Sequence, residues 1–222
     1  MRIMSVILAM MFSLSVHAES RAKAHSKAVS AAASLHQFMA HDNEAIPISL
    51  LKHAECVTVI TKMIRGGFII GARTGWGVTS CRTSHGWSPA AFHQLNGISW
   101  GFLAGFEKLD IVLVFTKPGA IEALSDSKLT LGADLSVTAG PVGRGLEAGT
   151  DYKLDSPVYS YSRGKGLYAG ASVNGSVLSA LEGYNHSVYG SQSSTRDILS
   201  DNNLNHINTA QPFIDALTEF AP

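Results

Sequence analysis

The sequence predicts an α+β protein: a strongly curved, mainly antiparallel β-sheet or barrel-like β body with an N-terminal amphipathic helix and short C-terminal helices. The first 65 residues contain no glycine and all 21 glycines lie beyond them, which separates a helical front from a β-rich body. Within that body the stretch 65–77, RGGFIIGARTGWG, alternates glycines with large apolar residues. Glycine lets a second backbone approach closely or lets a sheet coil sharply, so we expect one strand at a bend.

A short glycine pattern recurs along the body. Glycine, a large apolar residue, two further residues and glycine stand at 101–105 and again at 166–170. The longer segments GFIIGARTG and GLYAGASVNG both follow basic residues, but their spacing differs by one residue, which argues against a solenoid repeat. Either a curved sheet reuses glycine–aromatic pairs, or the segment was duplicated.

The N-terminus has the pattern of a secretory signal peptide at residues 1–18. Arg2 supplies a positive charge, residues 3–14 form an apolar run, and Val16-His17-Ala18 is a small-x-small cleavage site. The run is too short to span a bilayer as a stable helix. We therefore expect an exported protein, periplasmic or secreted, with a helical segment at 19–44 and a single β-rich domain at 45–222, long enough for a real core.

The segment 20–40 is rich in alanine and predicts a helix. Its apolar residues recur at helical spacing and form one stripe: Ala28, Ala31, Ala32, Leu35, Phe38 and Met39. Three cations cluster at its start, namely Arg21, Lys23 and Lys27. A basic amphipathic helix can lie on an anionic membrane surface. Alternatively, the stripe packs on the domain and the cations are solvated.

Further elements follow from local patterns. We expect a helix at 47–54, strands at 57–61, 65–77, 78–82, 91–93, 97–106 and 110–115, a helix at 117–124 capped by Thr116, strands at 129–139, 157–161 and 167–178, a helical turn at 196–200 and a closing helix at 211–220. Tyr184, Asn185 and Tyr189 fall in a polar segment. Cys56 and Cys81 lie in β-like sequence and form either a disulfide or two buried thiols.

Composition and motifs exclude several functions. Basic and acidic residues number 17 each, so nucleic acid is not an expected partner. The chain carries no HExxH, paired CxxC, GxSxG or Walker motif, and its histidines lack ligand spacing. We therefore predict no cofactor, no metal site and no enzymatic activity. A Ser/His/Asp triad, which geometry alone defines, is the weakest hypothesis.

Five basic residues lie near glycine-rich turns: Lys62, Arg65, Arg144, Arg163 and Lys165. If they meet at one rim of the sheet, they form a positive patch, and each cation near an anionic bilayer contributes about 1 kcal/mol. The alternative is a set of scattered, solvated charges. The loop 140–145, GPVGRG, is either an anion-binding loop assisted by Arg144 or a plain turn.

Several stretches together resemble one family. They are IPISLLKHAECVTV, RGGFIIGARTGWGV, GWSPAAF, the GFLAG segment leading to DIVLVF, LGADLSVTAGPVGR, and YSRGKGLYAGASVNGSVL followed by Asn185 and Tyr189. In this order the set resembles the SYLF domain, a lipid-binding module of bacterial envelope proteins and eukaryotic endocytic actin regulators. The resemblance implies a single α+β domain that binds phospholipids without catalysis. It also matches Arg65, Arg163 and Lys165 to basic positions of the family.

The leading hypothesis is an exported, non-enzymatic protein that associates peripherally with anionic phospholipid membranes through a basic patch and an amphipathic helix. Because export removes the chain from the cytosol, we do not expect actin or cytosolic phosphoinositides as ligands. Two alternatives remain. One is an envelope protein that binds a small amphiphile inside the β body. The other is a structural or interaction protein of the cell envelope, docked through exposed Trp76, Trp87 or Trp100.

Overall fold

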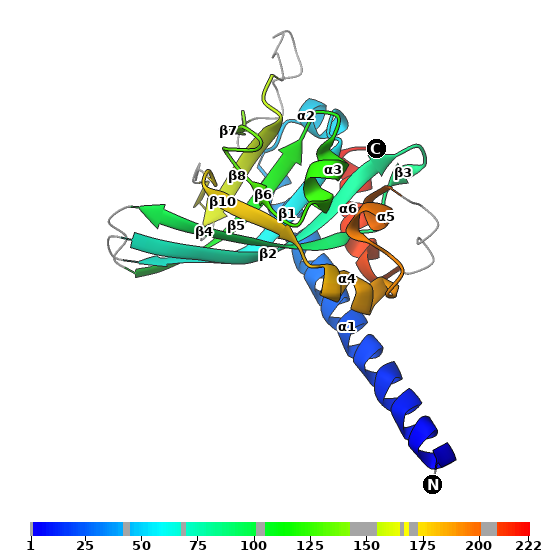
Figure 1. The fold of residues 1–222 in the computed structure, drawn as a ribbon. Helices are drawn as coiled ribbons and strands as arrows, with labels where there is room; N and C mark the ends of the chain where they lie inside the picture. Colours follow the sequence, from blue (N-terminus) through cyan, green and yellow to red (C-terminus); the bar gives the residue numbers. More distant parts are fainter. Residues whose placement is uncertain are drawn as a thin grey trace.

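The computed structural model describes residues 2–41, 45–67, 70–100, 105–142, 155–164, 167–168, 173–200 and 208–222. A ten-stranded, mainly antiparallel sheet curls into a half-barrel that carries helices on its faces, which confirms the predicted fold class (Figure 1). The helices are α1 (Arg2–Met39), α2 (Ile48–Lys52), α3 (Ala120–Ser125), α4 (Glu182–Tyr189), α5 (Thr195–Ser200), η2 (Asn208–Ala210) and α6 (Gln211–Phe220). The strands are β1 (Cys56–Gly67), β2 (Ile70–Thr83), β3 (Gly86–Trp87), β4 (Ala91–Trp100), β5 (Gly105–Phe115), β6 (Leu129–Thr130), β7 (Val137–Ala139), β8 (Val158–Gly164), β9 (Leu167–Tyr168) and β10 (Ser176–Ala180).

The strand order is β6-β10-β4-β2-β1-β5-β8-β7, with β3 paired to β2 and β9 paired to β8. Neighbouring strands are antiparallel except for the parallel pair β7 and β8. The four central strands are the longest, and their ends project together beyond the helices at the left of Figure 1. We call this projection, residues 64–67, 70–74, 96–100 and 105–108, the arm.

The predicted single strand at 65–77 is wrong. β1 ends at Gly67 and β2 begins at Ile70, and Gly67 pairs with Gly71 across a hairpin. Residues 68 and 69 lie outside the described residues. The predicted strand at 97–106 likewise divides, because β4 ends before residue 101 and β5 begins after residue 104. A glycine-rich alternation suits a bend and a chain reversal equally, since both need the same backbone freedom.

Other boundaries also differ from prediction. The helix expected at 117–124 begins only after Gly119, which has a positive φ of 92°, and Thr116 does not cap it. The Thr116 hydroxyl instead donates to the carbonyl oxygen of Ser156 at 2.8 Å. The strand expected at 129–139 divides into β6 and β7, which pair with different strands. The polar segment containing Tyr184 and Asn185 forms α4.

Helices cover both faces of the sheet. In Figure 1, α3 lies above the sheet and α1 below it, and we call the two sides the α3 face and the α1 face. The six residues of the predicted α1 stripe are all buried. Full burial of a side chain as large as Leu35 or Phe38 contributes about 2 kcal/mol. The stripe therefore packs against the domain and is not available for contact with a membrane.

Cys56 and Cys81 form a disulfide between β1 and β2, where they stand opposite each other in the register. Both side chains are buried in the core. This resolves the choice between a disulfide and two free thiols. The bond joins the two longest strands at the end remote from the arm and closes a loop between residues 25 positions apart.

His93 lies in the core on the α3 face, and its pKa makes stability depend on pH. Its Nε2 donates to the carbonyl oxygen of Leu124 at 2.9 Å, so its Nδ1 accepts from the Thr79 hydroxyl at 3.0 Å. Burial lowers the pKa of His93, and the hydrogen bond to Leu124 only partly opposes that shift. Above about pH 6.5 the imidazole is neutral in both the folded and the unfolded chain. Below it, the unfolded chain binds a proton that the folded chain resists.

We expect His93 to make the protein less stable as the pH falls below about 6.5, by up to about 1.4 kcal/mol per pH unit. Urea unfolding between neutral pH and pH 5 measures this slope for the natural chain and for His93→Gln. Exposed His85→Gln is the matched control and should keep the natural slope. Identical slopes for the natural chain and His93→Gln would show that His93 is not responsible.

Candidate functional site

The arm exposes one face of the sheet on the same side as α1. Side chains along a strand alternate between faces, and Trp76 of β2, which contacts α1, therefore shares its face with Thr74. Thr74 pairs with Ile64 on one side and with Asn96 on the other, and Ile64 pairs with Lys108. The exposed side chains of this surface, which we call the arm face, are Ile64, Ala72, Thr74, Asn96, Ile98 and Lys108.

Two isoleucines make the arm face unusual. Ile98 is 63% exposed and Ile64 is 43% exposed, although the same face of the sheet is buried under α1 farther along these strands. A single exposed apolar residue needs no explanation. Here two exposed isoleucines share a surface with a lysine, and this combination suits a partner that is apolar and anionic.

A bulge in β1 presents a second lysine next to the arm face. The register of β1 shifts between Thr61 and Ile64, and Lys62 within it has a φ of 52°, which is rare for a residue other than glycine. The backbone N–H of Lys62 donates to Oδ1 of Asp110 at 2.7 Å, which holds this conformation. The Lys62 side chain is exposed, and among the described residues its ammonium has no carboxylate partner.

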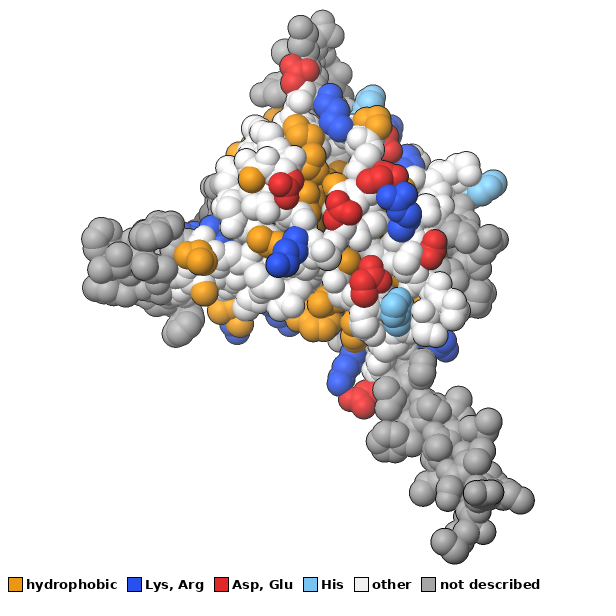
Figure 2. Space-filling model, viewed as in Figure 1, with side chains coloured by type: hydrophobic (Ala, Val, Ile, Leu, Met, Phe, Trp, Pro, Cys, Tyr) orange, Lys and Arg blue, Asp and Glu red, His pale blue; other side chains and the backbone are white. Residues whose placement is uncertain are grey.

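Arg163 links α1 to the same surface. In the strand register, Arg163 of β8 stands opposite Asp110 of β5. The Nη1 of Arg163 donates to the carbonyl oxygen of Gln37 in α1. Asp110 lies two residues after Lys108, so both point to the α1 face. Figure 2 shows apolar and basic side chains along the lower edge of the molecule, between the arm and α1.

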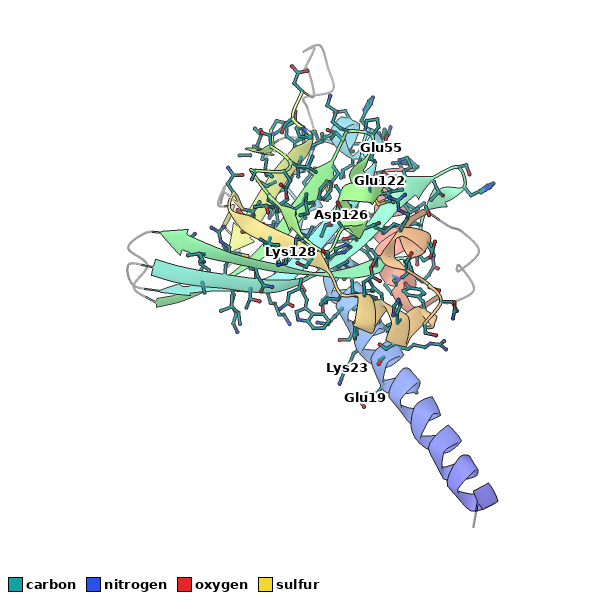
Figure 3. All side chains as sticks on the ribbon, in the orientation of Figure 1. Glu19, Lys23, Glu55, Glu122, Asp126 and Lys128 are labelled. Atoms are coloured by element: carbon teal, nitrogen blue, oxygen red, sulfur yellow. A yellow bond between two sulfur atoms is a disulfide. The ribbon has the colours of Figure 1, made fainter. Side chains whose placement is uncertain are left out.

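A cavity of about 740 Å³ opens where α1 passes β2 and α4. It is lined by Glu19, Ser20, Lys23, Ser26, Lys27, Trp76 and Tyr184. The Lys27 ammonium lies 3.9 Å from the centre of the Trp76 ring, and the Tyr184 ring meets Trp76 edge-on at 5.2 Å. Glu19 and Lys23, labelled in Figure 3, form an exposed ion pair with 2.6 Å between Oε1 and Nζ. We call this the Trp76 cavity.

The charges of the Trp76 cavity are not balanced. Burial lowers the pKa of Lys27, whose ammonium has no carboxylate partner among the described residues. The Glu19 carboxylate is held by Lys23, whose hydrogen bond and charge lower its pKa. Tyr184 donates its hydroxyl to the carbonyl oxygen of Ser20 at 3.3 Å, and burial raises its pKa. The cavity thus carries one cation without a counter-ion.

The structure gathers some of the predicted basic residues and separates others. Lys62, Arg163, Lys23 and Lys27 lie along the α1 face or on α1 itself. Arg65 follows exposed Ile64 and so points to the α3 face. Arg21 does not add to the surface, because it donates its Nε to the carbonyl oxygen of Val188 at 3.1 Å. Arg144 and Lys165 lie outside the described residues.

The sequence patterns did not single out several residues that the structure places on the arm. Lys108 and Ile98 reach the arm face only through the strand register. Arg73 stands opposite Arg65 across the β1–β2 hairpin, and burial together with the charge of Arg65 lowers the pKa of Arg73. A hairpin predicted within RGGFIIGAR would pair these two arginines, because they stand at its two ends.

Other chemistries find little support in the part of the chain that the structure describes. No group of three His, Cys, Asp or Glu side chains there could hold a metal ion. Both ring nitrogens of His93 are hydrogen-bonded, to Thr79 and to Leu124, so no described serine uses this histidine as a base. None of the described helices has the length and apolar character that crossing a membrane requires. Trp87 is buried and donates Nε1 to the carbonyl oxygen of Ala221, so it forms no docking patch.

The fold belongs to the α+β class: a helix-covered half-barrel that presents cations and isoleucines on one projecting face. The chain belongs to the Ysc84 family, described as "Las17-binding protein actin regulator", whose pattern matches residues 96–220, more than half of the chain. This confirms the resemblance to the SYLF domain family. The family is one of binding and regulatory proteins.

Relatives come from fungi and animals. The chain is 34% identical over 161 residues to the SH3 domain-containing protein PJ696.02 of Schizosaccharomyces pombe, covering 71% of this chain and 37% of the relative. It is 35% identical over 162 residues to protein YSC84 of Saccharomyces cerevisiae, covering 71% and 34%. It is 32% identical over 159 residues to SH3 domain-containing YSC84-like protein 1 of Homo sapiens, covering 71% and 46%. The chain thus spans between about a third and a half of these relatives' length.

These comparisons correct one expectation about partners. The export pattern at residues 1–18 led to the expectation that actin is not a partner. That inference is wrong at the level of the family, whose description names Las17 binding and actin regulation. A further relative, of Saccharomyces cerevisiae, is named LAS seventeen-binding protein 3.

Proposed function

We propose that this protein is an exported, non-enzymatic binding protein that adsorbs to anionic phospholipid membranes through the arm face and the neighbouring cations. The observation that carries the proposal is the exposure of Ile98 and Ile64 beside Lys62 and Lys108. An interfacial binding surface needs apolar side chains that enter the headgroup region and cations that meet anionic lipids. The arm face and the bulge supply both.

Magnitudes favour reversible adsorption. The described cations on this side are Lys23, Lys27, Lys62, Lys108 and Arg163, and the carboxylates among them are Glu19 and Asp110. At about 1 kcal/mol per net charge the electrostatic attraction is roughly 3 kcal/mol. Partial burial of two isoleucines adds about 1 kcal/mol each. The apolar stripe of α1 is buried, so α1 contributes its basic side rather than its apolar side.

Two observations support export. Residues 1–18 have a charged start, an apolar run and a small-x-small site. The Cys56–Cys81 disulfide suits an oxidising compartment, because disulfides persist there and are rare in the cytosol. The proposed location is therefore periplasmic or secreted, at the membrane periphery.

Vesicle co-sedimentation of the purified protein tests this function. We expect it to pellet with phosphatidylcholine vesicles that contain phosphatidylglycerol, and to remain in solution with pure phosphatidylcholine. Raising the salt to about 0.5 M should release it, because exposed charges are then screened over a few ångströms. Failure to pellet with anionic vesicles at low salt would remove the proposal.

The family description favours a second candidate, a partner within the actin-regulating machinery. This candidate rests on the relatives, whose sequences extend well beyond the matched part. Co-sedimentation with actin filaments in the absence of lipid tests it. Pelleting with filaments and not with anionic vesicles would place this function first.

A further inference from the structure

We propose that the Trp76 cavity is a headgroup site that takes the phosphate of an anionic phospholipid, with Lys27 as the counter-ion and Trp76 as the wall. The inference rests on the proposed membrane function and goes beyond it, because it assigns one lipid molecule to a defined place. The volume of about 740 Å³ lies within the range of small-molecule sites, about 300–1,000 Å³.

Lys27 is the cation at the centre of the proposed site. Its side chain is half-buried, its ammonium lies over the Trp76 ring, and no described carboxylate neutralises it. A cation withdrawn from water costs free energy unless an anion pairs with it. Lys23, on the next turn of α1, already pairs with Glu19. Of the two lysines, Lys27 is therefore the one that can pair with an anionic ligand.

The cavity lies on the same side of the sheet as the arm face. Trp76 lies two residues along β2 from Thr74, so it points to the same side of the sheet as the arm face. A bilayer in contact with Ile64 and Ile98 would therefore lie on the same side of the sheet as the cavity. Indole rings favour the membrane–water boundary because one end is apolar and the other is polar. A lipid could thus place its phosphate near Lys27 while its acyl chains remain in the bilayer.

Charge selects the class of lipid. Aromatic walls also bind choline through cation–π attraction. Here Lys27 already occupies the face of Trp76, and a quaternary ammonium would meet its positive charge. The site should therefore prefer phosphatidylglycerol to phosphatidylcholine. The shared chemistry is a phosphate group, and the contiguity with the arm face favours its lipid source over free phosphate.

Titration calorimetry with short-chain lipids that stay monomeric tests the site apart from the membrane. We expect dihexanoyl phosphatidylglycerol to bind the natural protein, and dihexanoyl phosphatidylcholine and inorganic phosphate to bind at least about tenfold more weakly. Lys27→Gln should weaken phosphatidylglycerol binding about tenfold, and Lys27→Arg should restore most of it. Lys128→Gln, at an exposed lysine that does not line the cavity, is the control and should change nothing.

The other outcomes contradict either the assignment of this site or the proposed function. Equal phosphatidylglycerol affinity in Lys27→Gln and the natural protein would remove Lys27 from the site. Equal affinity for inorganic phosphate would show an anion site without lipid preference. Absence of short-chain binding while anionic vesicles still bind would refute the cavity and leave the proposed function intact. Short-chain binding without vesicle binding would refute the proposed function instead.

Discussion

Replacing Lys62 and Lys108 together by glutamate is expected to abolish co-sedimentation with phosphatidylglycerol vesicles at low salt. The two exposed lysines stand beside the two exposed isoleucines, and their reversal lowers the local charge by about four units. This removes the electrostatic attraction of roughly 3 kcal/mol, which corresponds to about a hundredfold loss in partitioning. Both side chains are exposed, so the unfolding free energy should change by less than about 0.5 kcal/mol.

The alternation of faces provides an internal comparison. Arg65 neighbours Ile64 in β1 but points to the α3 face, so Arg65→Gln should leave vesicle binding within about twofold of the natural protein. A loss as large as that of the Lys62 and Lys108 double variant would mean that the sheet has no preferred membrane side.

Replacing Cys56 and Cys81 together by alanine is expected to lower the free energy of unfolding by about 3.5 kcal/mol. The bond joins residues 25 positions apart, and in the chain-entropy model a loop of that length restricts the unfolded chain by this amount. For a domain of this size the midpoint of thermal unfolding should fall by about 10 °C. Calorimetry or circular dichroism with and without reductant measures the effect.

The same reductant supplies the control for the disulfide. The natural protein should lose stability when reduced, whereas the double alanine variant should unfold at the same temperature in both conditions. A natural protein that is equally stable in reductant would show that the disulfide does not stabilise the fold.

Local patterns predicted those elements whose structure depends on neighbours in sequence. The closing helix α6 has the predicted bounds, with Phe213 and Leu217 buried, because its apolar residues recur at helical spacing. The apolar run ending at Phe115 lies buried in β5, as a short continuous apolar run predicts for a core strand. By contrast, a chain reversal within RGGFIIGARTGWG leaves no trace in the alternation of glycines, so this pattern predicts one strand where the structure has a hairpin.

The candidate site depends on relations that the sequence does not display. The pattern of basic residues near glycine turns predicted Lys62 and Arg163 as site residues. It could not predict the face of the sheet to which a side chain points, because neighbouring residues of a strand, such as Ile64 and Arg65, point to opposite faces. Lys27 meets Trp76 only because α1 packs across β2, and Lys108 joins the arm face only through pairing with β1. Composition could therefore suggest a basic patch without locating it.

The most direct measurement compares two double variants of equal net charge in one vesicle titration: Lys62→Glu with Lys108→Glu, and Lys117→Glu with Lys128→Glu. All four lysines are exposed, but Lys117 follows the far end of β5, roughly 30 Å from Lys108 at the rise of a β-strand. We predict that the first pair abolishes binding to phosphatidylglycerol vesicles and that the second pair weakens it only slightly. Equal loss in both variants would contradict adsorption through the arm face.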